Sequence, residues 1–249
     1  MPESCYHVKN TVCPQCRRIG NDKSGDNLAV YSDGHSWCWS CGYYVSGSGI
    51  SRFKSRVHQE PITKHEVVLP SDSDVCYPTR ALEWVGHYDL TRNDLLNHNA
   101  LWSESYKRLI FPIYGDTGLI AYQGRYFGEE KRPKWWGVGD LKNTFHILGK
   151  SSSQLVLVED IVSAIKLSKF TMAMPLFGSH VGAVRFKRLY SLYKDTVEVC
   201  VYLDPDKRSE SIVEARRGML CGLRTRVIYS ERDPKEESVE KLKEILLTD

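Results

Sequence analysis

The chain has 249 residues, a formal net charge of +3 and 41% hydrophobic residues. This length allows one large domain or two to three small ones, and the weakly basic charge permits nucleic-acid binding without arguing for it. No apolar run is long enough to span a membrane, and the N-terminus lacks a signal-peptide pattern, so we expect a cytoplasmic protein with no membrane partner.

Cysteine is concentrated near the N-terminus, where two Cys-x2-Cys pairs are separated by 21 residues. Four of the eight cysteines form these pairs: Cys13, Cys16, Cys38 and Cys41. In a cytosolic chain the pattern predicts zinc, because each tight turn aims two thiolates at one ion and two turns complete a tetrahedron. A redox pair is the alternative. We expect neither His7 nor His35 on the metal, and a closed four-thiolate site is structural.

Polar and aromatic residues surround the second pair: Asp33, His35, Trp37, Trp39, Tyr43 and Tyr44. Flat rings stack on unpaired bases, and Asp and His side chains hydrogen-bond base edges, so we hypothesise that this rim binds single-stranded nucleic acid. Trp37 and Trp39 share parity in the predicted hairpin, so one face holds both. The sequence leaves open whether they form the small core of the ribbon or a base-stacking platform.

Composition divides the chain into four segments. Residues 1–46 form the predicted β zinc ribbon, and residues 47–74, rich in Gly, Ser and charge, form a predicted flexible linker. Residues 75–150 are predicted to be a basic α+β subdomain, and residues 151–249 a subdomain built on a parallel sheet. The expected fold class is therefore α/β, with a separate N-terminal ribbon.

The basic subdomain is predicted to hold two short helices and a hairpin. The helices lie between residues 79 and 99, and Thr91 followed by Asp94 predicts an N-cap with an acid in the first turn. The segment 107–127 alternates around a Gly-Asp-Thr-Gly turn, which predicts a β-hairpin. Residues 100–150 contain eight Lys and Arg against five acids.

After residue 150, short apolar runs alternate with amphipathic segments. The apolar runs cover residues 155–158, 172–177, 197–203 and 224–230. The amphipathic segments lie near residues 160–169, 182–194, 208–221 and 235–247. This alternation predicts a parallel sheet covered by helices on both faces.

Acids or a Gly turn follow each of these apolar runs. Glu159 follows the first run, Asp204 and Asp206 follow the third, and Asp233 follows the fourth. Because the carboxyl ends of parallel strands meet at one edge, where such sheets bind ligands, these carboxylates gather there and repel one another unless a hard cation joins them. The pattern indicates a Mg²⁺ site. An ordinary helix N-cap is the alternative role for Asp160 and Asp206.

Two of these stretches carry a family resemblance. VLVEDIVSAIKLS (156–168) and VCVYLDPDKRS (199–209) resemble the TOPRIM domain shared by topoisomerases and bacterial-type primases. A zinc ribbon, a linker, a basic subdomain and then TOPRIM is also the order of those primases. The chain is most similar to the primase portion of bacteriophage primase–helicases, in which Asp-Gly-His precedes the second Cys pair, as Asp33-Gly34-His35 does here.

The resemblance implies roles for individual residues. Glu159 resembles the catalytic glutamate, and Asp204 and Asp206 resemble the Asp-x-Asp that holds Mg²⁺, with Mn²⁺ as a possible substitute. Asp233 resembles a later acidic magnesium position. Residues of the basic stretch that would grip template and nucleotide are Arg125, Lys131, Arg132 and Lys134. In the ribbon, Asp33 and His35 resemble template-reading residues.

The chain also departs from the family pattern. Ser163 stands where the family has an acid, and Asp160 stands where it has Gly. Any role that the family assigns to the missing acid is therefore open in this chain.

The resemblance implies a DNA primase, a DNA-dependent RNA polymerase that makes short RNA primers on single-stranded DNA from ribonucleoside triphosphates during phage replication in the host cytoplasm. A TOPRIM-type metal-dependent nuclease and a non-catalytic single-stranded DNA-binding replication factor are the alternatives. Gly149-Lys150-Ser151 resembles the end of a phosphate-binding loop, but Thr144 stands where that loop needs Gly. We therefore expect no helicase motor in these residues, and a separate replicative helicase as a partner.

Overall fold

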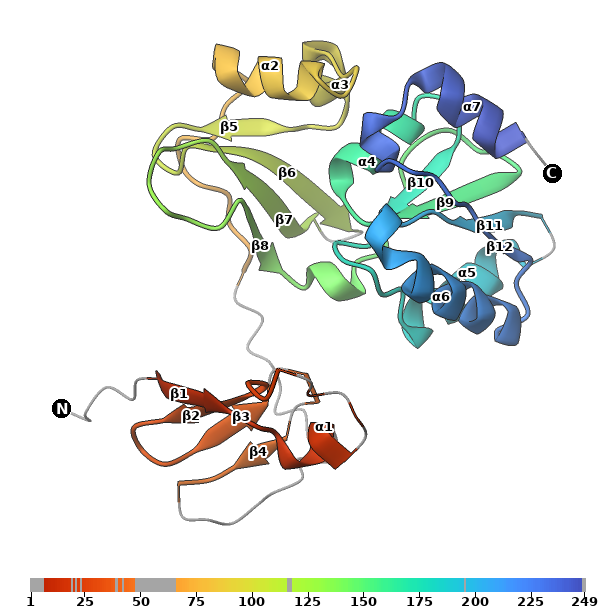
Figure 1. The fold of residues 1–249 in the computed structure, drawn as a ribbon. Coiled ribbons are helices and arrows are strands. Elements are labelled where there is room, and N and C mark those ends of the chain that lie inside the picture. The colour runs from red at the N-terminus through yellow and green to blue at the C-terminus, as the bar shows by residue number, and fades with distance from the viewer. Residues whose placement is uncertain are drawn as a thin grey trace. The chain divides into compact units, whose positions relative to one another are not determined.

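The structure is a computed structural model that describes residues 7–18, 20, 22, 24–38, 40–41, 43–47, 66–115, 118–194 and 196–247. The chain divides into two compact units, residues 1–64 and residues 65–249 (Figure 1). Within the described ranges, no helix combines the length and the apolar composition needed to cross a membrane.

The N-terminal unit is built on an antiparallel sheet. Its strands lie in the order β1 (His7–Thr11), β2 (Leu28–Tyr31), β3 (Ser36–Cys38) and β4 (Tyr44–Val45), and helix α1 (Pro14–Arg18) lies between β1 and β2 in the chain. Three cysteines and Leu28 are buried together, with Tyr43 packed against them. So small an apolar core, among the described residues, does not by itself balance the entropy lost on folding, and a metal bound by the cysteines would add stability.

The second unit begins with an antiparallel region. Helices α2 (Thr79–Gly86) and α3 (Arg92–Asn97) precede a sheet in the order β5 (Leu101–Ser103), β6 (Arg108–Gly115), β7 (Gly118–Tyr126) and β8 (Trp135–Gly139), and the 3₁₀ turn η1 (Leu141–Asn143) follows. The predicted hairpin is confirmed as β6 and β7. The predicted N-cap is confirmed as well, because Thr91 and Asp94 form a reciprocal capping box. The sequence did not predict β5 or β8.

The remaining residues form a parallel sheet with the strand order β10-β9-β11-β12. Its strands are β9 (Gln154–Val158), β10 (Met172–Pro175), β11 (Glu198–Val201) and β12 (Thr225–Val227). Its helices are α4 (Ile161–Leu167), α5 (Ala183–Tyr193), α6 (Arg208–Leu220) and α7 (Val239–Leu247), and its 3₁₀ turns are η2 (Pro205–Lys207) and η3 (Pro234–Glu236). Each predicted apolar run forms a strand and each predicted amphipathic segment contains a helix, so the predicted parallel sheet is confirmed.

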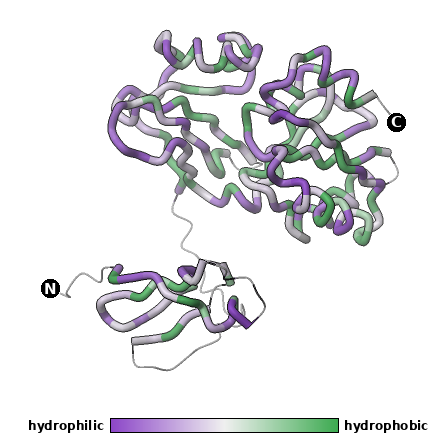
Figure 2. Tube along the Cα trace, viewed as in Figure 1, coloured by the Kyte–Doolittle hydropathy of each residue, from purple (hydrophilic) through white to green (hydrophobic). Residues whose placement is uncertain are grey.

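Two hydrophobic cores cover the two faces of this sheet. Val156 and Val158 point into the core formed with α4 and α7, whereas Leu155 and Leu157 point into the core formed with α5 and α6. Successive side chains of a strand point to opposite faces, so continuous apolar runs are what a sheet covered on both faces requires. Figure 2 shows these strands as largely hydrophobic.

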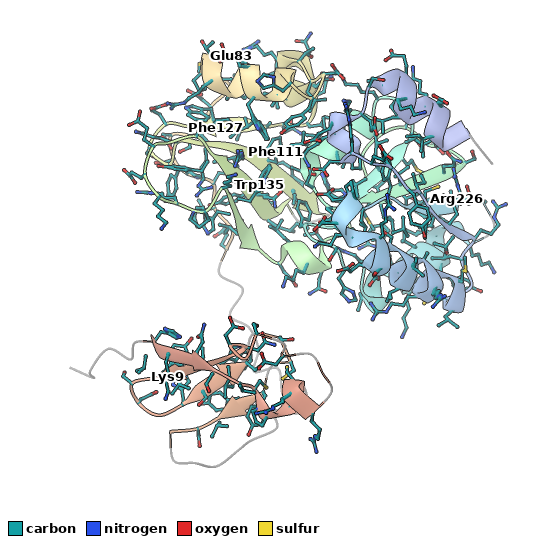
Figure 3. The ribbon with its side chains drawn as sticks, viewed as in Figure 1. Lys9, Glu83, Phe111, Phe127, Trp135 and Arg226 are labelled. Carbon is teal, nitrogen blue, oxygen red and sulfur yellow. The ribbon has the colours of Figure 1, made fainter. Side chains whose placement is uncertain are left out.

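The first core continues into the antiparallel region. Leu109 and Phe111 of β6 are buried with the residues of α4, and Trp135 packs beside Phe111 at a ring-centroid distance of 6.3 Å (Figure 3). Lys166 of α4, 1% exposed, donates a 2.9 Å hydrogen bond to Asp89, in the connection from α2 to α3. The second unit therefore folds as one body.

Part of the segment that the sequence assigns to the linker is attached to this body. Asp72 accepts hydrogen bonds of 2.7 Å from the Ser103 hydroxyl and from the Ser105 backbone N–H. Asp74 forms a backbone bridge with Trp102. The ordered second unit thus includes residues before the predicted boundary at residue 75.

Candidate zinc centre and acidic active site

The four predicted cysteines converge in the N-terminal unit. Their sulfur atoms all lie within 4.8 Å of one another, and the Cys13–Cys41 and Cys16–Cys38 sulfur pairs are each 3.6 Å apart. Four Zn–S bonds of about 2.3 Å in a tetrahedron require sulfur separations of about 3.8 Å, so the thiolates fit a structural zinc. Neither His7 nor His35 belongs to the group.

The two Cys-x2-Cys turns are arranged in the same way. The backbone N–H of Cys16 points at the sulfur of Cys13, and that of Cys41 points at the sulfur of Cys38, each at 3.5 Å. Such contacts favour the thiolate form of the sulfur. Burial by itself would raise the pKa of Cys38, but the hydrogen bonds from Cys41 lower it to about 7. Cys38 is thus prepared to release its proton to a metal, whereas burial raises the pKa of Cys13, despite the N–H group of Cys16 that points at its sulfur.

Trp37, Tyr44 and Tyr31 lie on one face of the ribbon sheet. Trp37 is paired with Tyr44 and with Ala29, and His7 is paired with Tyr31, and directly paired residues share a face. His35 stacks on Tyr31 at a centroid distance of 4.2 Å and an interplanar angle of 10°. Leu28, paired with Cys38, belongs to the opposite, zinc-facing side. The sheet therefore separates a metal face from an aromatic face.

The residues predicted to read the template differ in their surroundings. Asp33 accepts hydrogen bonds from His35, at 2.5 Å from the ring Nδ1 and 3.1 Å from the backbone N–H. Trp37 is 39% exposed, whereas Tyr43 packs against the buried cysteines. Tyr44 is half-buried beside the Trp37 ring. Trp39 lies outside the described residues.

In the second unit, Glu159 and Asp204 are brought together at the carboxyl edge of the parallel sheet. Glu159 directly follows β9 and Asp204 follows β11, and these strands are neighbours. The backbone N–H of Asp204 donates a 3.1 Å hydrogen bond to Oε1 of Glu159. Burial raises the pKa of Glu159, and Asp206 and Asp160 raise it further against the opposing effect of this hydrogen bond.

Asp204 carries the strongest sign of a cation site. Its Oδ1 atom is buried and, in the described part of the chain, has no hydrogen-bond partner. Burial raises its pKa to about 7, and the carboxylates of Glu159, Asp233 and Asp160 add to the effect while the Lys235 ammonium opposes it. A buried, unpartnered carboxylate oxygen beside a second carboxylate is a suitable donor for Mg²⁺, which prefers oxygen ligands. These residues therefore fit the metal.

Asp206 is oriented differently. It lies in η2 with a side chain 70% exposed, and its Oδ2 accepts a 2.7 Å hydrogen bond from Lys207, which lowers the pKa of Asp206. Among the described residues, only the four cysteines bring three or more ligand atoms within 4.8 Å of one another. The acidic residues thus share one edge of the sheet, and the Asp206 side chain is exposed to solvent beside Lys207.

Asp160 and Asp233 belong to a second group at the same edge. Asp160 is the N-cap of α4, as in the alternative considered from the sequence, and its Oδ1 accepts hydrogen bonds from the N–H groups of Val162 and Ser163. The Lys235 ammonium bonds to Oδ2 of Asp233 at 2.7 Å and to Oδ2 of Asp160 at 3.2 Å. Lys235 is thus the cation that joins these two carboxylates, and no pattern in the sequence singled it out.

The four predicted basic residues have two kinds of environment. The Arg125 guanidinium lies over the rings of Trp84, Phe127 and Trp135, at 5.3, 5.8 and 5.8 Å from their centroids. Burial there lowers its pKa. Lys131, Arg132 and Lys134 are exposed on the connection between β7 and β8, where Arg132 pairs with Glu130. Figure 3 labels Phe127 and Trp135, which belong to the ring cluster around Arg125.

Arg108 is another cation that the sequence analysis did not single out. It is 5% exposed and donates hydrogen bonds to the carbonyl oxygens of Gly124 and Pro133 at 2.9 and 3.0 Å. It therefore fixes the base of the β7–β8 connection that carries the exposed basic residues. The sequence does indicate this role, because Arg108 begins a long apolar strand. An arginine in such a buried position is stable only when its guanidinium is hydrogen-bonded.

No protein-family model matches the chain, and no curated protein sequence matches it. Solved structures do match its fold. The zinc-binding and RNA polymerase domains of Aquifex aeolicus primase match at 15% identity with a TM-score of 0.56, over 99% of this chain and 79% of that chain. The primase fragment of the bacteriophage T7 primase-helicase protein matches at 13% identity with a TM-score of 0.51, over 97% of this chain and 98% of that chain.

Both structural matches cover nearly the whole chain. Because the sequence identities are only 15% and 13%, the matches establish a shared fold. They agree with the expected fold class, an N-terminal zinc ribbon followed by a mixed α/β unit with a parallel sheet. The chain therefore has the fold of the Aquifex zinc-binding and RNA polymerase domains and of the T7 primase fragment.

Proposed function

We propose that the chain is a DNA primase, which joins ribonucleoside triphosphates into short RNA primers on a single-stranded DNA template. The observation that carries the proposal is the Glu159–Asp204 pair with its buried, unpartnered Asp204 Oδ1, at the edge of a sheet in a chain with a primase fold. The same edge is where parallel α/β sheets bind ligands. A zinc ribbon with an exposed aromatic face adds a second grip on nucleic acid.

The reaction is attack of a ribonucleotide 3′-hydroxyl on the α-phosphate of a second nucleotide, with release of pyrophosphate. Mg²⁺, when bound, would supply positive charge that stabilises the charge developing on the phosphates. Glu159 and Asp204 would hold it from the sheet, and Asp206, exposed on η2, would complete the set by turning from Lys207. The alternative role for Glu159 is to accept the hydroxyl proton instead of holding the metal, and burial raises its pKa, which suits a general base.

The exposed basic residues would hold the phosphates. Lys131, Arg132 and Lys134 lie on one connection between two strands, where charge-assisted hydrogen bonds to template or triphosphate oxygens can form. Arg125 is packed among aromatic rings, so we assign it the role of shaping this surface as well as adding charge. Asp233 is paired with Lys235 and is therefore a weaker candidate for the metal than the resemblance implies.

The ribbon would select the template. The Asp33–His35 pair offers hydrogen-bonding groups, and Trp37 offers an exposed ring on the same sheet. Starting a chain requires two free nucleotides on a weakly held template, so a second grip has a clear physical purpose. A separate replicative helicase is the partner we propose, and the cytoplasm of a phage-infected cell is the proposed place of action.

The test is primer synthesis on a pool of randomised single-stranded DNA templates with labelled ribonucleoside triphosphates and Mg²⁺. The expected products are short oligoribonucleotides that are complementary to a short sequence shared by the productive templates. Shortened templates without nucleotide incorporation would instead identify a nuclease. DNA binding with neither product would identify a binding protein, and either result would contradict the proposal.

A further inference from the structure

Lys235 holds an unusual position for a lysine at the edge of a parallel sheet. Its side chain is 17% exposed, and its ammonium lies between the carboxylates of Asp160 and Asp233 at 3.2 and 2.7 Å. The two carboxylates therefore hold the ammonium in place at the acidic edge.

The position of Lys235 is set by the protein core. Its backbone carbonyl accepts a 2.9 Å hydrogen bond from Lys166, whose side chain is 1% exposed in α4. Lys166 also bonds to Asp89 at 2.9 Å, so η3 is tied to both α4 and the connection between α2 and α3. Because a buried lysine costs free energy unless it is fully bonded, this arrangement fixes η3 and with it the ammonium of Lys235.

The carboxylate of Asp160 is already fully engaged. Its Oδ1 receives the N–H groups of Val162 and Ser163 at 2.8 and 3.0 Å, and its Oδ2 receives the Ser163 hydroxyl at 2.9 Å in addition to Lys235. Two oxygens that accept four hydrogen bonds have no favourable direction left for a metal. Asp233 gives Oδ2 to the same lysine.

The carboxylates of Glu159, Asp204 and Asp206, at the same edge, are not bonded to Lys235. Asp204 Oδ1 has no partner among the described residues, Glu159 is held beside it, and Asp206 is exposed to solvent. Mg²⁺ binds through one or two carboxylates and otherwise keeps water or takes phosphate oxygens, so these residues are enough for a single ion.

We propose that Lys235 is a built-in counter-ion that supplies the charge a second divalent cation would otherwise bring, so that this acidic edge takes a single divalent cation, on Glu159, Asp204 and Asp206. This inference rests on the proposed function, because that function is the reason to expect one cation at this edge. It follows that Asp233 is not a metal ligand. Asp160, which accepts a hydrogen bond from the Ser163 hydroxyl, instead binds the lysine.

The test counts bound Mn²⁺ on the full zinc-loaded chain without nucleotide, by electron paramagnetic resonance of the free ion. The Mn²⁺ bound weakly by the Asp204→Asn variant is subtracted from the Mn²⁺ count of each other variant. The wild type is expected to bind one Mn²⁺. Lys235→Met, which frees Asp160 and Asp233, is expected to bind two. Lys235→Arg keeps the charge and is expected to bind one, as is Lys187→Met, which changes an exposed lysine of α5.

A wild-type count of none or two would overturn the inference, and so would a count of one for Lys235→Met. If Lys235→Met does not fold, Asp233→Asn replaces it: one bound Mn²⁺ supports the inference, and a loss of binding contradicts it. The same experiments distinguish a failure of this inference from a failure of the proposed function. One bound Mn²⁺ without primer synthesis contradicts the primase assignment alone, whereas two bound ions with primer synthesis contradict the role of Lys235 alone.

Discussion

The backbone N–H of Asp204 donates a hydrogen bond of 3.1 Å to Oε1 of Glu159, across 45 positions of sequence. The bond joins the ends of β9 and β11, which are neighbours in the parallel sheet. It orients the Glu159 carboxylate toward the residue that follows β11, while Oδ1 of Asp204 itself stays buried without a partner in the described structure. A change at either carboxylate therefore alters the environment of the other.

The pH dependence of stability reports on this pair. Burial raises the pKa of Asp204 from 3.8 to about 7, so between about pH 4 and pH 7 the folded state keeps a proton that the unfolded state has released. The free energy of unfolding, measured by urea without added divalent cation, is therefore expected to fall as the pH rises through this window. Asp204→Asn is expected to reduce that slope and to be more stable than the wild type at pH 8.

The control for this measurement is Asp206→Asn. Asp206 is exposed and its hydrogen bond with Lys207 lowers its pKa, so it stays ionised in both states across the window. This variant should keep the wild-type slope. An unchanged slope in Asp204→Asn would show that Asp204 does not carry the raised pKa.

Loss of a zinc ligand should unfold the ribbon and leave the second unit intact. Cys38→Ser removes one of four thiolates, and the small core of the ribbon does not compensate, since structural zinc supplies much of the folding free energy of such modules. Zinc content by atomic absorption should fall from about one per chain to near zero. Cys76→Ser, which changes an exposed cysteine outside the cluster, should keep its zinc. Equal zinc in both variants would exclude the site.

The role of the Trp37 ring can be separated from a role in the ribbon core. The ring is 39% exposed, so Trp37→Ala should retain zinc. Its affinity for single-stranded DNA should fall by about fivefold to a hundredfold, which corresponds to the stacking free energy of one base on an aromatic ring. Fluorescence anisotropy measures the affinity. Tyr229→Ala, which removes another exposed ring, is the control. Loss of zinc in Trp37→Ala would instead assign the ring to the core.

Arg125 and Lys131 should differ in their effect on stability. The Arg125 guanidinium lies over three rings, so Arg125→Ala should lower the free energy of unfolding by about 1–3 kcal/mol through lost packing and cation–π contacts. Lys131→Ala changes an exposed residue and should stay within about 0.5 kcal/mol of the wild type. Urea unfolding measures both, and equal effects would contradict the different environments.

Much of the parallel sheet could be predicted because its signals are local. The continuous apolar runs from Leu155 to Val158 and around Val199 are long enough to indicate buried strands, and the acids that follow them locate the edge where ligands bind. Thr91 and Asp94 encode their own cap within four residues. The same locality explains the zinc site, since two short turns specify all four ligands.

Other features depend on contacts that a sequence does not display. Strand β8 is missed because two of the five residues of Trp135–Gly139 are glycines, and it becomes a strand through pairing with β7. Whether Trp37 is core or surface depends on which face of the ribbon carries the metal. Lys235 stands two residues after Asp233, but its second partner, Asp160, is 75 positions away.

A role of Asp204 in RNA synthesis is tested by the initial rate of dinucleotide formation from labelled ribonucleoside triphosphates on single-stranded DNA with Mg²⁺. Asp204→Asn is compared with Glu231→Gln, a matched change of an exposed acid after β12. We predict a rate lower by about a hundredfold or more in Asp204→Asn and an unchanged rate in Glu231→Gln. Equal rates in Asp204→Asn and the wild type would show that Asp204 has no part in RNA synthesis.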